Sequence, residues 1–237
     1  AKAAEISDSV VRENAIADIE EAFNRNELDY GRKLYLIENC IYGVDIQPIA
    51  VQIAKLRFFI SLVVDQKIDD ARENRGIVPL PNLETKFVAA NTLIGLDRPQ
   101  QLVLRNPAID QKEQELDRVR KQHFSARSLQ KKRKCRQEDL QLRAEISVLL
   151  KEDGFQRETT EKLAYWDPYD QNASADFFDQ EWMFGIINGF DVVIANPPYV
   201  RQEDIKEYKP LFQKLGYRVF NSTSDLYTYF YELSYNI

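Results

Sequence analysis

Three short apolar segments, each followed by a polar side chain, constrain most strongly what this chain can fold into. They are CIYGV before Asp45, FVAA before Asn91, and FDVVIA before Asn196. Segments with helical spacing lie between them, and this alternation favours an open, mostly parallel α/β sheet. Ligands bind such sheets outside the carboxyl ends of the strands, so we expect the three polar residues to share one edge.

The helical segments divide the chain into three parts. Residues 1–105 form the N-terminal part of the core, with a helix over 7–27 and a second helix from Pro48 to about Asp65. Residues 106–160 are rich in Lys, Arg, Glu, Gln and Leu, and they predict a helical hairpin inserted into the core. We expect Gly154 to close the second helix of this hairpin.

Residues 161–237 begin with an aromatic-rich connection that we expect to be irregular, and they contain the third strand. A helix is predicted around 202–214, followed by a terminal amphipathic helix that Ser224 or Asp225 can cap. The aromatic side chains of the connection predict a core patch that closes the insertion onto the sheet. They are Trp166, Phe177, Phe178, Trp182 and Phe184.

Composition indicates a soluble globular protein, since 44% of the 237 residues are hydrophobic and 30% are charged. No apolar run approaches the roughly 18 residues of a membrane span. Cys40, Cys135 and His123 cannot build a usual zinc site, and we expect no metal. Two distant cysteines and no secretory signal indicate a reducing, cytoplasmic setting.

One segment is strongly basic although the net charge of the chain is −6. Between Arg118 and Arg136 there are nine Lys or Arg residues and no acidic residue. This segment is either a solvated helix face or an arm that contacts DNA phosphates. The candidate contacts are Arg118, Arg120, Lys121, Lys131, Lys132 and Arg133. His123 is expected at the surface, without a catalytic role.

The Asn-Pro-Pro-Tyr corner that follows the third strand indicates a site that could bind an amino group and promote its methylation. Pro197 and Pro198 hold the backbone of this corner extended and stiff, and neither contributes an N–H donor. The side-chain carbonyl of Asn196 and the backbone carbonyl of Pro197 can accept both hydrogens of an exocyclic amino group. The nitrogen lone pair would then be ready to attack a methyl group. Tyr199 offers a ring on which an extruded base can stack.

The other two polar residues could bind a nucleoside cofactor, although each could equally serve the local backbone. Asp45 could accept both ribose hydroxyls, with Ile46 packed on the adenine, or it could cap the helix that begins at Pro48. Asn91 could bind the edge of an adenine ring, or it could form the turn that follows its strand.

The segment DVVIANPPYV resembles the catalytic motif of DNA adenine amino-methyltransferases, which use S-adenosylmethionine. IYGVDIQPIAVQIAKLR and FVAANTLIG are similar to the second and third motifs of that family. The flanking segments resemble the methylase region of bifunctional type IIG restriction–modification enzymes of bacteria. The resemblance implies a Rossmann-like methyltransferase core and roles in cofactor binding for Asp45, Ile46 and Asn91. It also implies that Asn196, Pro197, Pro198 and Tyr199 hold a flipped adenine of double-stranded DNA.

The glycine-rich first motif of that family does not precede Asp45, so we expect the chain to be a fragment whose first strand lies upstream. The remaining domains of the parent polypeptide are its expected partners, and no membrane is. Asp70, Glu84 and Lys86 have the spacing of a nuclease site, but such a set arises readily by chance. Alternative functions are methylation of RNA or of protein glutamine, and non-catalytic docking on DNA.

Overall fold

The computed structural model describes residues 28–96 and 106–237, and the helix expected over 7–27 lies outside them. The described residues form a mixed α/β structure in which helices predominate around a small parallel sheet. The elements that precede the insertion are α2 (Leu28–Asn39), β1 (Gly43–Asp45), α3 (Pro48–Val64), η2 (Glu73–Gly76) and β2 (Phe87–Ala89).

The sheet pairs β1 with β2 in parallel, with Gly43 opposite Phe87 and Asp45 opposite Ala89. Both strands lie where the sequence predicts them, and the helix predicted from Pro48 is confirmed as α3. The ring of Phe87 packs directly on Gly43, and a Cβ atom at position 43 would lie 2.5 Å from Cδ1 of that ring.

The third predicted strand is absent from the described structure, and this expectation is wrong for the chain as folded here. Residues 190–195 form no strand, and Val192 and Ile194 are 74% and 92% exposed. Among the described residues, no strand lies beside this segment to complete its backbone hydrogen bonds, and a strand is stable only with such a neighbour. Its first N–H group, that of Phe190, donates to the C-terminal Ile237 carbonyl at 2.6 Å.

Residues 107–152 form two consecutive helices, α4 (Pro107–Phe124) and α5 (Leu129–Glu152), which pack as a hairpin. Side chains cap both helices, since Asn106 accepts from Ala108 N at 3.0 Å and Ser128 from Lys131 N at 3.2 Å. Gly154 follows α5 with a φ of +93°, a conformation that glycine adopts without strain.

The connection that follows is more regular than the sequence predicts, because it contains α6 (Arg157–Tyr165) and α7 (Gln180–Phe184). The side chains of Thr159, Thr160 and Leu163 are buried, and α6 packs along α5. The predicted aromatic core patch is confirmed, since its members join one buried cluster with Val88 of the sheet and Leu116 and Ile146 of the hairpin.

The C-terminal region contains α8 (Lys209–Lys214) and α9 (Leu226–Asn236). The helix predicted over 202–214 is reduced to turns followed by α8, because Pro210 favours a helix start and disfavours helical backbone just before it. Asp225 is the residue before α9 but forms no side-chain cap there.

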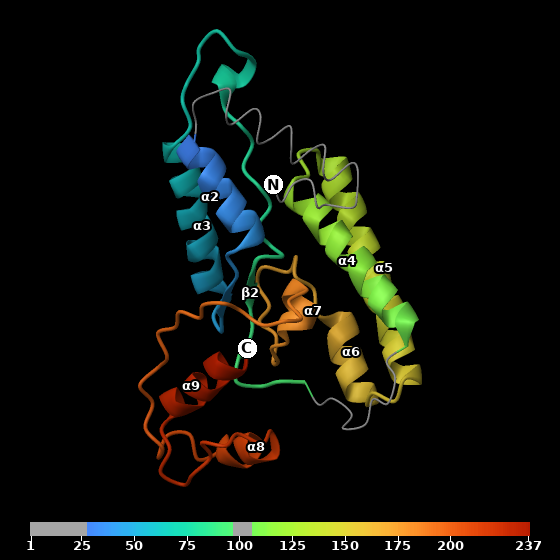
Figure 1. Ribbon diagram of the computed structural model, residues 1–237, viewed down its shortest axis with the longest axis vertical. Coiled ribbons are helices and arrows are strands. Elements are labelled where there is room, and N and C mark those ends of the chain that lie inside the picture. The colour runs from blue at the N-terminus through green and yellow to red at the C-terminus, as the bar shows by residue number, and fades with distance from the viewer. Residues whose placement is uncertain (1–27, 97–105) are drawn as a thin grey trace.

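The C-terminal helices and the turn of the α4–α5 hairpin lie at different ends of the molecule (Figure 1). Strand β2 runs toward the end where α8 and α9 lie, whereas the turn between α4 and α5 lies at the opposite end. No helix among the described residues is both long and apolar enough to cross a membrane.

Candidate functional site

Asp45 lies at the carboxyl end of β1, as predicted, and its side chain is exposed. Its Oδ1 accepts from the backbone N–H of Gln47 at 2.8 Å, just before α3. The carboxylate therefore serves the local turn, and its second oxygen can still accept a bond from a ligand. Ile46 is 59% exposed, so its side chain is open to an incoming aromatic ring.

Asn91 lies two residues beyond the end of β2 and is half-buried. Its Oδ1 accepts from Leu93 N at 3.3 Å, which is the turn-forming role that the sequence allows. Among the residues that the structure describes, none accepts a hydrogen bond from the side-chain N–H₂ group of Asn91, so this group can donate to a ligand. Because β1 and β2 are adjacent and parallel, Asp45 and Asn91 share the carboxyl edge of the sheet.

The Asn-Pro-Pro-Tyr corner is solvent-accessible. Asn196 and Pro198 are exposed, Pro197 is half-buried and Tyr199 is 85% exposed. The ring of Tyr199 lies 6.3 Å from the ring of Tyr227 on α9, measured between centroids. The corner therefore presents amide and carbonyl groups beside an accessible aromatic ring.

The C-terminal region that carries this corner is attached to the segment that leaves the sheet. Leu93, two residues after Asn91, is buried in a cluster with Ile205, Phe212 and Tyr229. The Tyr217 hydroxyl donates to the Leu93 carbonyl at 2.9 Å. The carboxyl edge of β2 and the C-terminal helices thus form one packed unit.

The predicted DNA contacts separate into two groups. Arg118, Lys121, Lys131 and Arg133 are exposed and Lys132 is half-buried, so they stay candidates. Arg120 is 8% exposed and is bonded to Asp139 and to the Trp182 carbonyl, which removes it from any DNA-contacting surface. The basic turn also lies far from the C-terminal helices along the long axis (Figure 1).

His123 is fully buried, which corrects the expectation that it lies at the surface. Its ring packs on Tyr169 with 4.7 Å between centroids, and its Nε2 accepts from Arg136 Nε at 3.4 Å. Burial, with a smaller contribution from Arg136, lowers the pKa of His123. A helix-surface pattern alone did not reveal this contact, because Tyr169 lies far along the sequence.

Sequence reasoning also missed a buried lysine beside β1. Lys86 is 9% exposed, and its Nζ lies 4.2 Å from the centroid of the Tyr42 ring. Burial lowers its pKa to about 8, against smaller opposing effects of Asp117 and Glu38. The other two residues with nuclease-like spacing belong to separate ion pairs: Glu84 pairs with Arg136, and Asp70 pairs with Arg75. No cluster of three metal-ligating side chains occurs among residues 28–96 and 106–237.

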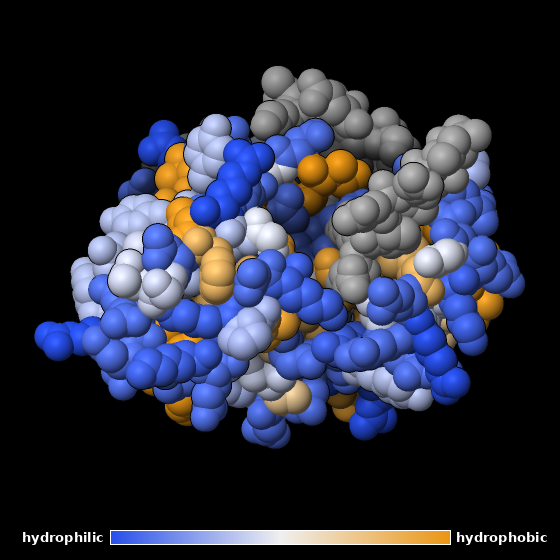
Figure 2. All heavy atoms as spheres, turned by 90° about the horizontal axis from the view of Figure 1, so that it is seen from below, coloured by the Kyte–Doolittle hydropathy of each residue, from blue (hydrophilic) through white to orange (hydrophobic). Residues whose placement is uncertain are grey.

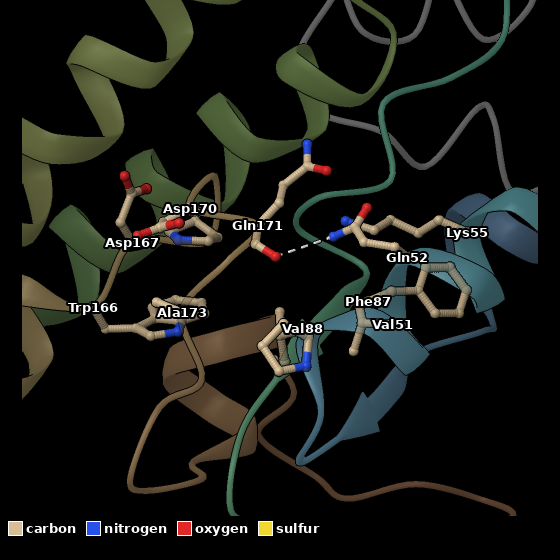
Figure 3. Close-up of a pocket in the computed structure, with 13 residues that line it drawn as sticks. Val51, Gln52, Lys55, Phe87, Val88, Trp166, Asp167, Asp170, Gln171 and Ala173 are labelled. Carbon is tan, nitrogen blue, oxygen red and sulfur yellow. Dashed lines mark hydrogen bonds between the residues drawn. The ribbon is translucent and has the colours of Figure 1, made fainter.

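A shallow pocket lies between α3, β2 and residues 166–173 (Figure 3). Gln52 spans its mouth and donates to the Gln171 carbonyl at 3.5 Å. Lys55, Asp167 and Asp170 supply charge around it. None of the predicted site residues lines this pocket, although its lining includes Ala89 at the carboxyl end of β2 and Pro48 at the start of α3.

Comparison with known proteins finds similarity to restriction-modification methyltransferases. The model of the family "Eco57I restriction-modification methylase" matches residues 39–237. A protein of Methanocaldococcus jannaschii, named "Putative type II restriction enzyme and methyltransferase", is 46% identical over 72 residues. That alignment spans 30% of this chain and 6% of the relative, so the chain matches only a small part of that protein. No solved structure matches the chain.

Proposed function

Because the chain belongs to the Eco57I restriction-modification methylase family, we propose that it is part of an S-adenosylmethionine-dependent DNA adenine methyltransferase. The observation that carries this proposal is the placement of Asp45 and Asn91 at one carboxyl edge of two adjacent parallel strands. In open α/β sheets this edge is where ligands bind. The two strands would then belong to a larger Rossmann-like sheet whose further strands come from the parent polypeptide.

The residues at this edge fit the nucleoside half of the cofactor. The second carboxylate oxygen of Asp45 would accept from the ribose hydroxyls, Ile46 would pack on the adenine, and Asn91 would donate to its edge. The fit rests on the exposure of Asp45 and Ile46 and on the side-chain groups that the local turns leave available. When bound, the cofactor supplies an electrophilic methyl group.

The corner at 196–199 would hold the target base. Asn196 Oδ1 and the Pro197 carbonyl would accept both hydrogens of the adenine amino group, and Pro198 would keep the backbone stiff. The accepting groups draw the two amino hydrogens toward themselves, which raises the electron density on the nitrogen, and they leave its lone pair directed out of the plane of the ring. Tyr199, which is 85% exposed, would stack on the extruded base.

The basic residues of the hairpin that remain accessible would contact the DNA backbone. They are Arg118, Lys121, Lys131, Lys132 and Arg133. Such contacts give affinity without sequence preference. Because the basic turn and the C-terminal helices lie at opposite ends of the molecule, the hairpin would reach DNA at a distance from the target base.

The proposal is tested by substituting Asn196 in the parent polypeptide and measuring transfer of a labelled methyl group to DNA. Asn196→Ala should lower transfer by roughly a hundredfold or more, the usual cost of removing one preorganised polar group from a reacting centre. Asn188→Ala, an exposed amide in the same segment, is the matched control and should leave transfer intact. Parallel assays of methyl transfer to RNA and to protein test the alternative substrates. Unchanged methylation by the Asn196→Ala variant would contradict the proposal.

Cofactor binding is tested separately by calorimetric titration of S-adenosylmethionine into the parent polypeptide. Asp45→Asn keeps an oxygen for the Gln47 N–H group and removes the charge, so the local turn should survive. We expect at least tenfold weaker binding by this variant. Asp69→Asn, another carboxylate that accepts from a backbone N–H two residues later, is the control and should bind normally.

A further inference from the structure

Helix α9 carries four tyrosines, and only one of them is explained by the core. Tyr229 is fully buried against Phe212 and Tyr217. Tyr231 and Tyr235 are instead 71% and 89% exposed. The buried face of α9 is completed by Tyr229 with the packed Leu226, Phe230 and Leu233. Packing therefore gives no reason for large rings on the outer face.

Two of these tyrosines continue an aromatic row that begins at the Asn-Pro-Pro-Tyr corner. The ring centroid of Tyr227 lies 6.3 Å from that of Tyr199 and 6.1 Å from that of Tyr231. Tyr227 and Tyr231 are four residues apart, so they lie on one side of the helix. We call Tyr199, Tyr227 and Tyr231 the tyrosine row.

The row is held in place by hydrogen bonds between the corner and the start of α9. Leu226 N donates to the Val200 carbonyl at 3.0 Å, and Gln202 N donates to Asp225 Oδ1 at 2.8 Å. These bonds tie the residues after Tyr199 to the first turn of α9. A ligand that stacks on Tyr199 therefore meets Tyr227 as a neighbouring surface.

The surroundings favour a flat, polar aromatic ligand. At the end of the molecule where α8 and α9 lie, hydrophilic residues cover most of the face and hydrophobic ones appear as separate groups (Figure 2). The acidic groups nearest in sequence are engaged, since Glu232 accepts from the N–H groups of Arg218 and Val219 at 2.8 Å. Tyr199 and Tyr231 are exposed and Tyr227 is half-buried between them. Accessible rings among polar residues provide stacking surfaces that any nucleobase can use.

We propose that the tyrosine row is a stacking surface for unpaired DNA bases, which extends contact beyond the single target adenine. This inference rests on the proposed function, because the role of Tyr199 in holding a base supplies the continuity of the surface. Tyr227 and Tyr231 would stack bases exposed next to the extruded adenine. The row would lower the cost of keeping the local strand unpaired while the target is held.

The test compares two single-stranded probes of equal length and charge. One is a DNA 12-mer that contains 2-aminopurine, and the other is a 12-mer of abasic residues. The full 237-residue chain should bind the base-bearing strand at least about tenfold more tightly than the abasic strand, and stacking should quench the 2-aminopurine fluorescence. Tyr231→Ala should reduce this preference by about tenfold, whereas Tyr231→Phe should preserve it.

Tyr165→Ala is the matched control, because Tyr165 is 83% exposed at the end of α6 and lies outside the row. Thermal unfolding of each variant shows that the fold is intact. Equal affinity for the two probes, or an unaltered preference in Tyr231→Ala, would overturn the inference. If that happens while Asn196→Ala still abolishes methylation by the parent polypeptide, the stacking surface is wrong and the proposed function stands.

Discussion

Arg120 on α4 and Asp139 on α5 form a buried ion pair, with 2.9 Å between Arg120 Nε and Asp139 Oδ2. Asp139 Oδ1 also accepts from Arg143 Nε at 2.7 Å. The two guanidinium groups reach beyond the hairpin, Arg120 to the Trp182 carbonyl at 2.7 Å and Arg143 to the Ala164 carbonyl at 2.7 Å. One carboxylate thus bridges the two arginines that hold the hairpin against α6 and α7.

Removing that carboxylate should destabilise the protein strongly. Asp139→Ala leaves the buried Arg120 guanidinium without its counter-charge and leaves Arg143 with Asp167 at 3.8 Å. Breaking a buried pair in this way costs about 3–5 kcal/mol. The free energy of unfolding in urea measures the effect. Glu138→Ala is the matched control, because Glu138 lies beside Asp139 on α5 and pairs with the exposed Lys134 at 3.6 Å. A loss similar to that of the control would contradict the role assigned to Asp139.

Lys86 should make stability rise with pH in the alkaline range. Its pKa is lowered to about 8 in the folded protein, so the unfolded chain binds more protons between pH 8 and pH 10. The charged form destabilises the folded state at neutral pH, and this penalty is relieved as pH rises through 8. We expect a gain of about 2 kcal/mol between pH 7 and pH 9.5.

Lys86→Met should abolish this gain while it retains the apolar contact with Tyr42. Urea unfolding of the wild-type chain and the variant at pH 7 and pH 9.5 checks the difference. Lys134→Met serves as the control, because Lys134 is exposed and paired with Glu138 at 3.6 Å. The same pH dependence in the Lys86 variant would assign the effect to other groups.

Gly43→Ala should weaken the sheet at its base. The new Cβ atom would lie 2.5 Å and 2.9 Å from two ring carbons of Phe87, too close for the ring to keep its position. Overpacking of this kind costs about 1–3 kcal/mol. Gly95→Ala is the control, since nothing lies within 4 Å of a Cβ atom at that position. Thermal unfolding should show a lower midpoint for Gly43→Ala alone.

The basic side chains at the start of α5 should contribute to DNA affinity. Replacing them should not lower the stability of the protein. Lys131 and Arg133 lie beside the positive end of the helix dipole, which disfavours cations there. Replacing each with alanine should keep or slightly raise the unfolding midpoint. The slope of log affinity for duplex DNA against log salt should fall by about one per residue.

Fluorescence anisotropy with a labelled duplex at several salt concentrations measures that slope. Lys151→Ala, an exposed lysine in the last turn of α5, is the control. A slope that is unchanged by substitutions at the start of α5, with affinity intact, would show that this segment is a solvated helix face.

Local sequence signals predicted the elements whose formation depends on near neighbours. Pro48 predicted the start of α3, and the long Lys- and Glu-rich region predicted the α4–α5 hairpin. Two apolar runs predicted β1 and β2. The placement of Asp45 and Asn91 followed from the ends of those runs. Helical periodicity and strand-end polarity are encoded within a few residues, so they can be read directly from the chain.

The tertiary structure decided the features that need partners distant in the sequence. The run before Asn196 has the composition of a strand, yet the described structure gives it no neighbour to pair with. Arg120 and His123 lie in a segment that looks uniformly basic and exposed, but Asp139 and Tyr169 draw them into the interior. The tyrosine row likewise depends on where the corner meets α9. Burial, strand pairing and ring contacts are decided by packing between segments, and periodicity along one segment cannot specify them.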